Sequence, residues 1–229
     1  TGLCWLSAAV VGALPFTLIA VPLNVTDAFF EAMSGITTTG STVMIGLDHA
    51  PPGILIWRAL LQWFGGIGII VTALAVLPML QVGGMQLFRM ESSDRSDKAL
   101  PRATQLAAWI AAIYGSLTLL WAVMLWIAGM SLFDAITHSM TTLATGGFST
   151  SDQSIGAYPQ PAIHWIITAG MIAGSLPFAL YLLAARGRAM PLLRDMQVRW
   201  FLGTLGTVIV GLSAAQIIFA SQDFSTAIR

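Results

Sequence analysis

Charged residues are scarce in this chain of 229 residues, which carries ten basic and ten acidic side chains, 9% of the total. Soluble domains average about 25% charged residues, so a soluble fold of this length would have little charge to cover its surface. Apolar residues make up 56% of the chain, which excludes intrinsic disorder and indicates an integral membrane protein. The formal net charge is zero, so the basic excess that nucleic-acid binding requires is missing.

Reactive motifs are also few. Cys4 is the single cysteine, which excludes an internal disulfide and a Cys/His zinc motif. The sequence has no Walker loop, no dinucleotide-binding glycine motif and no HExxH motif. Ser139 adjoins His138, but adjacency alone does not make a nucleophile, a base and an orienting group. We therefore expect no enzyme activity and no organic cofactor.

The basic residues gather in two polar stretches, whereas many acidic residues lie elsewhere. The basic stretches contain Arg89, Arg95, Lys98 and Arg102, and then Arg186, Arg188, Arg194 and Arg199. Segments with almost no basic residues contain Asp27, Glu31, Asp48, Asp134, Asp152 and Asp223. Because basic residues mark cytoplasmic loops, we expect residues 81–102 and 186–199 to be cytoplasmic. The loops near 22–53, 129–161 and 221–229 are then expected outside.

Five apolar runs alternate with these loops. They are Leu3–Val21, Ile54–Leu80, Leu106–Ala128, Ala162–Ala185 and Phe201–Ala220. A helix needs about 20 residues to cross a bilayer, and the length of each run is near or above this value. The pattern therefore predicts five crossings. The first run has no starting Met, no positive n-region and no cleavage pattern. We therefore expect a part of a longer chain rather than a signal peptide.

Two shorter segments follow the first and third runs and repeat each other. Residues 27–36 precede the sequence Thr-Thr-Thr-Gly-Ser-Thr at 37–42, and residues 132–143 precede Ala-Thr-Gly-Gly at 144–147. A shift of 107 positions places Asp27 on Asp134, Met33 on Met140 and Gly40 on Gly147. The following runs superpose with one inserted residue, which places Trp57 on Trp165 and Gly66 on Gly174. The repeated unit is helix, short helix, Thr/Gly loop, helix.

Both short segments begin and end outside, so each is expected to enter the membrane and return. Non-helical backbone at membrane depth is tolerated only where protein or a water-filled cavity covers it. A Thr/Gly loop suits this position because its carbonyls can replace the hydration shell of a cation. The negative end of each short helix would point at that cation. A tight turn with a hydroxyl cap is the alternative for either loop alone.

Several polar residues have structural or functional interpretations. Asp27 and Asp134 are predicted to be the N-caps of the short helices, with cation attraction as the alternative. Glu31 and His138 are ionisable residues on those helices, and a hydrogen-bonded structural role is favoured over direct function. Arg58 is expected to snorkel or to pair locally.

Glycine and proline interrupt the runs that follow each loop. Either these residues allow close helix packing or they are hinges that shape an inner vestibule. The candidates are Gly65, Gly66, Gly68, Gly174 and Pro177, and Gly203 and Gly206 carry the same ambiguity.

These motifs resemble a known family. The repeat, the Thr-Thr-Thr-Gly-Ser-Thr loop and the stretch Trp-Arg-Ala-Leu-Leu-Gln-Trp-Phe-Gly-Gly-Ile-Gly at 57–68 are similar to bacterial Trk-type potassium uptake proteins. The similarity is to the TrkH/TrkG branch of the Trk/Ktr/HKT superfamily and extends over essentially the whole chain. It implies an all-α integral membrane fold of M1–pore helix–M2 units. Four such units, each donating one loop to a single potassium filter, are expected in the family.

The resemblance also implies roles for individual residues. Gly40 and Gly147 match the filter glycines, with Thr37 and Ala144 deeper in the filter. Potassium would be held by the backbone carbonyls of Thr38, Thr39, Thr145 and Gly146. The second loop departs from Thr-Thr-Thr-Gly, so backbone ligation would persist without identical side-chain bracing.

The resemblance implies potassium uptake across the bacterial inner membrane by a multi-pass homodimer in the lipid bilayer. It further implies a cytosolic, nucleotide-binding regulatory subunit of the TrkA type. A secondary transporter that binds another small cation or solute at broken helices is the alternative. The repeats run in the same orientation, which disfavours an inverted-repeat transporter.

The expected organisation divides the chain into five parts. Residues 1–80 form the first repeat, 81–102 and 186–199 form cytoplasmic loops, and 103–185 form the second repeat. Residues 200–229 begin a third repeat, with a short helix starting near Asp223.

Overall fold

The computed structural model describes residues 2–18, 23–76, 99–188 and 190–220. All regular structure in these residues is helical, as expected for an all-α membrane protein. The helices are α1 (Gly2–Leu18), α2 (Val25–Ile36), η1 (Leu47–His49), α3 (Pro52–Val76), α5 (Ala99–Ile127), α6 (Leu132–Leu143), η2 (Ser154–Ala157), α7 (Pro161–Ser175), α8 (Phe178–Ala185), α9 (Met190–Arg194) and α10 (Met196–Ala220).

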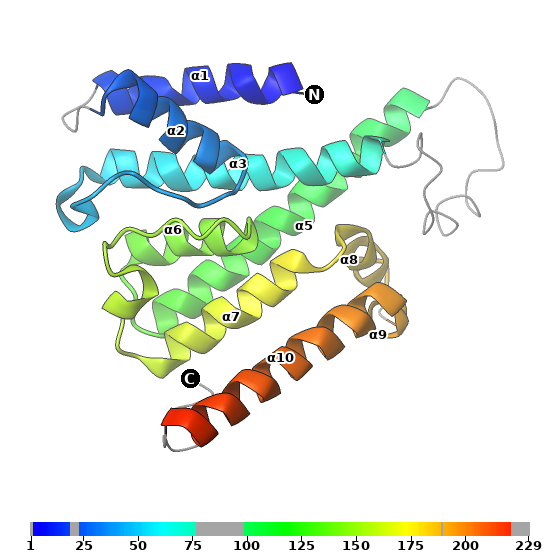
Figure 1. Cartoon of the computed structure of the whole chain (residues 1–229). Coiled ribbons are helices and arrows are strands. Elements are labelled where there is room, and N and C mark those ends of the chain that lie inside the picture. Colours follow the sequence, from blue (N-terminus) through cyan, green and yellow to red (C-terminus); the bar gives the residue numbers. More distant parts are fainter. Residues whose placement is uncertain (1, 19–22, 77–98, 189, 221–229) are drawn as a thin grey trace. The chain divides into compact units, whose positions relative to one another are not determined.

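The chain separates into two compact units, Thr1–Ser175 and Leu176–Arg229. The first unit contains two helical triplets, α1–α2–α3 and α5–α6–α7, and Figure 1 shows a short helix beside longer helices in each triplet. Helix α3 contacts both short helices, α2 and α6, so it is a helix of the first triplet that packs against the second.

Small residues allow the first triplet to pack closely. Its core includes Ala9 and Phe16 of α1, Ala28 and Ala32 of α2, and Ile54 and Leu61 of α3. A Cβ added to Gly12 or to Gly35 would come within 3.0 Å of the Leu61 side chain. The absence of a side chain at these two glycines therefore lets Leu61 fit between α1 and α2. The Trp57 indole donates a hydrogen bond to the Gly12 carbonyl at 2.9 Å, which ties α3 to α1.

The second triplet is held together in a similar way. Leu125 of α5, Ala135 of α6, and Ile163 and Ile167 of α7 form its apolar core, together with Met130. The Trp121 indole donates a hydrogen bond to a carbonyl of α7, at Ile166, over 2.9 Å.

Helix termini in both triplets follow known capping rules. Helix α5 ends in a Schellman turn, in which Gly129 has φ +110° and the Met130 amide donates to the Leu125 carbonyl at 3.1 Å. Helices α3 and α7 both begin with proline, whose missing N–H costs nothing at a helix start.

Helices α3 and α7 superpose with two inserted residues rather than the predicted one. The starting prolines, Pro52 and Pro161, lie 109 residues apart. The same offset relates Ile54 to Ile163, which are 2% and 0% exposed. It also relates Gly65 to Gly174, and a Cβ at either would overlap the carbonyl of the last residue of the short helix in its own triplet. The pairing of Trp57 with Trp165 and of Gly66 with Gly174 is therefore wrong, because identical letters fell one position from the structural match.

Within the described residues, three helices are long and apolar enough to cross a membrane: α3, α5 and α10. A fourth span results if α7 and α8 count as one interrupted crossing. Helix α1 is apolar but has 17 residues, and positions 19–21 of the predicted run lie outside the described residues. Four of the five predicted crossings thus have a counterpart by length and composition.

The glycines of α3 support the packing interpretation rather than a hinge. Helix α3 continues without a break through Gly65, Gly66 and Gly68. A Cβ at Gly66 would lie 2.6 Å from the Tyr114 hydroxyl, and one at Gly68 would lie 3.3 Å from the Trp5 ring. In the second triplet the helix does stop, after Ser175, and Pro177 is the N-cap of α8. Proline disfavours a helical conformation at the residue before it, which accounts for this interruption.

The predicted loop at 186–199 is partly helical. It contains α9, and α10 begins within it at Met196. Asp195 accepts hydrogen bonds from the Gln197 and Val198 amides at 2.9 and 3.2 Å, so it caps the start of α10. Of the other predicted loop, 81–98 lies outside the described residues and α5 already includes 99–102. The short helix expected near Asp223 also lies outside them.

Candidate functional site

The two short helices, α2 and α6, have the same length and the same N-terminal capping. Each has 12 residues, and their starts lie 107 positions apart. The N-caps are Asn24 and Ser131, whose side chains accept hydrogen bonds from the Asp27 and Asp134 amides at 2.8 and 3.1 Å. The prediction that the aspartates are N-caps is therefore wrong. Each aspartate lies three residues further on, and its carboxylate accepts a hydrogen bond from the side chain of the N-cap residue at 2.7 Å.

The loops that follow α2 and α6 share an uncommon backbone path. Thr38 and Thr145 both have φ +55°, and Gly40 and Gly147 have φ +79° and +84°. A positive φ is rare for β-branched threonine and costs of order 1–3 kcal/mol. The same unfavourable conformation at matched positions indicates that the surrounding structure fixes the path of both loops.

The loop amides point back at the short helices. The Thr38 and Thr39 amides donate to the carbonyls of Gly35 and Ser34, both at 2.9 Å. In the second loop, the Thr145 and Gly146 amides donate to carbonyls of α6 at 3.0 and 2.9 Å. Among the described residues, no donor reaches the carbonyl oxygens of these four loop residues. The backbone therefore uses its donors internally and leaves its oxygens available.

Side-chain bracing differs between the loops. The Thr37 hydroxyl donates to the Met33 carbonyl at 2.7 Å and lies 2.8 Å from the Thr39 hydroxyl. The corresponding residues in the second loop are Ala144 and Gly146, which have no hydroxyl. The second loop therefore has no counterpart of the hydroxyl contacts that Thr37 makes in the first.

Helix α3 occupies the space that larger side chains would need in the second loop. A Cβ at Gly146 would overlap the carboxamide of Gln62, which is itself fully buried. Gln62 Oε1 accepts a hydrogen bond from the Phe148 amide at 3.1 Å. Ala144 packs against Gly66, where an added Cβ would lie 3.2 Å from Ala144 Cβ.

The two loops lie directly against each other. A Cβ at Gly40 would overlap the Gly146 carbonyl oxygen. Both the positive φ and this contact require glycine at position 40. The structure therefore brings together the predicted filter residues of the two triplets, although they are separated by more than 100 positions in sequence.

The ionisable residues Glu31 and His138 occupy corresponding positions on α2 and α6, and both are buried. Each bonds to a hydroxyl residue just beyond its loop. Thr42 donates to Glu31 at 2.9 Å, and His138 Nε2 lies 3.0 Å from Ser149 Oγ. Both residues thus tie a short helix to its own returning segment, which supports the structural interpretation.

Arg58 does not snorkel, because it is only 1% exposed. Its Nε donates to Glu31 Oε1 at 2.8 Å, so local pairing is the correct alternative. A guanidinium reaches water only when its path is open, and the Phe148 ring covers it at 4.1 Å.

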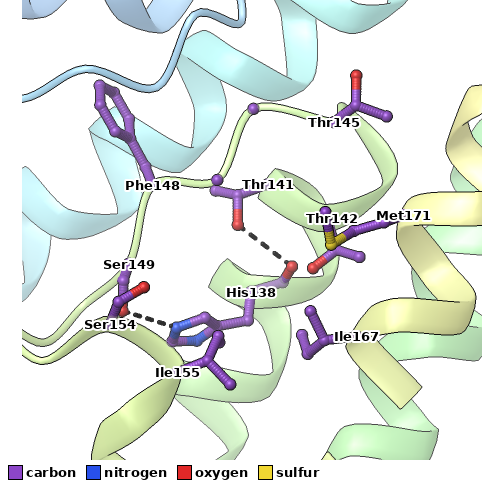
Figure 2. A pocket seen from close by; sticks show the side chains of 12 residues that line it. His138, Thr141, Thr142, Thr145, Phe148, Ser149, Ser154, Ile155, Ile167 and Met171 are labelled. Carbon is purple, nitrogen blue, oxygen red and sulfur yellow. Dashed lines mark hydrogen bonds between the residues drawn. The ribbon is translucent and has the colours of Figure 1, made fainter. Parts of the chain in front are cut away.

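A pocket opens on the side of α6 that faces α7 (Figure 2). His138, Thr142 and Thr145 line it together with Ile167 and Met171 of α7. Tyr158, which directly follows η2, stacks edge-on to His138 at 5.5 Å between ring centres. Burial raises the pKa of the Tyr158 hydroxyl, so that group stays neutral near pH 7.

The sequence did not assign roles to Gln62, Thr42 or Ser149. Gln62 and Arg58 are one helical turn apart in an otherwise apolar helix, and this spacing is a signal that could have marked them as partners of the second loop. No feature of the sequence marked Thr42 or Ser149 as partners of residues on the short helices.

The site lacks the chemistry of a transition-metal centre. Among the described residues, no group of three or more His, Cys, Asp or Glu side chains could hold a metal ion. What the loops offer is a set of neutral oxygens at the C-terminal ends of two short helices, an arrangement suited to a weakly held alkali cation.

Comparison with known proteins assigns the chain to a family. Residues 3–228 match the TrkH family of cation transport proteins. The chain belongs to the TrkH family. Transport rather than catalysis is the activity named for its relatives. Among them, the potassium uptake protein TrkI of Halomonas elongata is 45% identical over 227 residues, which cover 99% of this chain and 46% of the relative. TrkH of Escherichia coli K12 is 46% identical over 212 residues, covering 91% of this chain and 44% of that protein.

The fold of this TrkH-family chain also matches a crystal structure. The potassium transporter TrkH from Vibrio parahaemolyticus superposes with a TM-score of 0.87 at 38% identity, covering 99% of this chain and 46% of that one. The chain thus spans less than half the length of these relatives.

Proposed function

We propose that this chain contributes two of the loops that form a potassium-conducting filter, and that the protein takes up potassium across the bacterial inner membrane. The observation that carries the proposal is the shared path of the two loops, with threonine at φ +55° and glycine at positive φ in both. Relatives named as potassium uptake proteins support the choice of ion.

In this proposal potassium replaces its water shell with backbone oxygens. The carbonyls of Thr38 and Thr39 in the first loop, and of Thr145 and Gly146 in the second, are the ligands. Thr37 and Ala144 lie deeper, and Gly40 and Gly147 give the backbone the required turn. The negative ends of the α2 and α6 dipoles lower the energy of the dehydrated cation. Helices α2 and α6 enter the bilayer from outside, and the basic stretches at 81–102 and 186–199 face the cytoplasm.

The family resemblance extends the proposal to the assembly. A homodimer in the lipid bilayer, bound to a cytosolic nucleotide-binding regulator of the TrkA type, is the expected form. Within this organisation, 1–80 and 103–185 are two M1–pore helix–M2 repeats, and 200–229 belong to a third.

Potassium uptake by the full-length protein in a bacterium that lacks its own uptake systems tests the proposal. Gly40→Ala forces a Cβ onto the Gly146 carbonyl at a positive φ, so uptake should fall at least about tenfold. Gly53→Ala is the control, because nothing lies within 4 Å of a Cβ there. Wild-type uptake by Gly40→Ala would overturn the filter assignment.

A further inference from the structure

A buried ion pair links the two loops through α3. Arg58 is 1% exposed and Glu31 is fully buried, and their closest atoms are 2.8 Å apart. Each of the three guanidinium nitrogens of Arg58 donates a hydrogen bond. Beyond the bond from Nε to Glu31, Nη1 donates to the Ser149 carbonyl at 2.9 Å and Nη2 donates to the Thr42 hydroxyl at 3.0 Å.

Each of these partners lies just beyond a filter loop. Thr42 follows Gly40 by two residues, and Ser149 follows Gly147 by two. Glu31 holds the first returning segment, because it accepts from the Thr42 hydroxyl at 2.9 Å and from the Val43 amide at 3.1 Å. One guanidinium therefore connects the outer ends of both loops.

This connection has no counterpart in the second triplet. At the offset of 109 residues, the positions of Arg58 and Gln62 are occupied by Ile167 and Met171 on α7. The position of Glu31 is occupied by His138, which bonds to the Ser149 hydroxyl of its own segment. The ion pair therefore belongs to the junction between these two loops, not to the repeated unit.

A buried ion pair contributes little net stability over a well-packed apolar pair of similar volume. What distinguishes this ion pair is the fixed direction of the hydrogen bonds that Arg58 donates. The planar guanidinium fixes three acceptors in one plane, whereas a lysine ammonium with the same charge does not. Arg58 is therefore suited to fixing a distance between two backbone segments.

We propose that Arg58 is a positioning residue that sets the spacing between the first two filter loops and thereby supports the preference for potassium over sodium. The inference rests on the proposed filter. Selectivity depends on the size of the cation cavity or on the number and field strength of its carbonyls. Either property changes if the outer ends of the loops separate.

The test measures potassium and sodium flux through the purified full-length protein in liposomes. Arg58→Lys keeps the positive charge but loses the planar guanidinium with its fixed donor directions. Thr42→Val removes one acceptor of Arg58 with little change in side-chain shape. Each should lower the potassium-to-sodium flux ratio by about tenfold, the size expected when a hydrogen bond to a charged group is lost. Thr42→Ser keeps the hydroxyl and should keep the ratio.

Thr168→Val is the matched control. The Thr168 hydroxyl bonds only to the His164 carbonyl of its own helix, at 2.8 Å, and its side chain is exposed. This variant should retain both the flux and the ratio of the wild type.

The outcomes separate the two proposals. A wild-type protein that carries no potassium would contradict the filter, and the inference with it. A selective wild type with an unchanged flux ratio in Arg58→Lys and Thr42→Val would overturn the positioning role alone, even if total flux fell. If Arg58→Lys fails to give a monodisperse protein, the comparison of Thr42→Val with Thr42→Ser decides, since Thr42 is exposed.

Discussion

The first and second loops follow the same backbone path with different side chains. Thr37 and Thr39 of the first loop correspond to Ala144 and Gly146 of the second. Helix α3 explains both differences, because it packs against the second loop through Gly66 and Gln62. In the first loop, by contrast, the side chains of Thr37 and Thr39 are exposed within the part of the chain that the structure describes. A filter made of side chains would not tolerate such substitutions, whereas one made of backbone oxygens needs only the path.

Gly146→Ala is expected to have the largest effect. The new Cβ would overlap the Gln62 carboxamide, which is held in place by the Phe148 amide. We expect potassium uptake to be lost and the free energy of unfolding to fall by about 1–3 kcal/mol. Uptake measurements and thermal denaturation of the purified protein check both effects.

A second substitution sharpens this prediction. Adding Gln62→Ala to Gly146→Ala should recover part of the stability, because it removes the overlapping group. If the double variant is no more stable than Gly146→Ala alone, Gln62 is not the reason for glycine at this position.

Next in size are the glycines that touch the last turn of each short helix. In Gly65→Ala the Cβ overlaps the Ile36 carbonyl, and in Gly174→Ala it would lie 2.6 Å from the Leu143 carbonyl. Both variants should lower the melting temperature, because each should lower the free energy of unfolding by about 1–3 kcal/mol. The larger decrease is expected for Gly65→Ala. Gly203→Ala, where no atom lies within 4 Å of a Cβ, is the control. Equal melting temperatures for all three would contradict the matched packing of the two triplets.

The N-caps of the short helices should contribute smaller and nearly equal amounts. Asn24→Ala and Ser131→Ala each remove the acceptor for the amide of the aspartate three residues on. Each should cost about 1 kcal/mol, measured as a shift in thermal denaturation. Glycine at the same positions should cost only a few tenths of that, and a loss several times larger in only one triplet would break the equivalence of α2 and α6.

Thr37→Ala is expected to have little effect on potassium uptake, because it makes the first loop resemble the second. The variant loses the hydrogen bonds to the Met33 carbonyl and the Thr39 hydroxyl, which should lower the free energy of unfolding by about 0.5–1.5 kcal/mol. Potassium uptake should be retained. Complete loss of uptake would show that the hydroxyl at 37 has a role beyond bracing.

Much of the fold was accessible from the sequence because the signals are strong. Long apolar runs predicted α3, α5 and α10, and the repeated spacing predicted α2 and α6. The N-caps were assigned to the wrong residues because Asn, Ser and Asp are all common N-cap residues. The sequence alone does not show whether the aspartate or the residue three positions earlier begins the helix. The offset between α3 and α7 was missed because a chance Trp match outweighed the prolines that begin both helices.

The contacts between the triplets could not be read in the same way. Arg58 reaches Ser149, and Gln62 reaches Phe148, only because α3 lies against the second loop, more than 80 residues later in the chain. Local patterns carry no information on such a contact. They do carry the polar spacing of Arg58 and Gln62 within an apolar helix, which indicates a buried partner without naming it.

The most direct test of the filter is to locate the cation itself. A crystal structure of the full-length protein soaked in rubidium, with its anomalous scattering recorded, should show a peak among the carbonyl oxygens of Thr38, Thr39, Thr145 and Gly146. A rubidium peak elsewhere along the pore, with none at these four oxygens, would contradict the account.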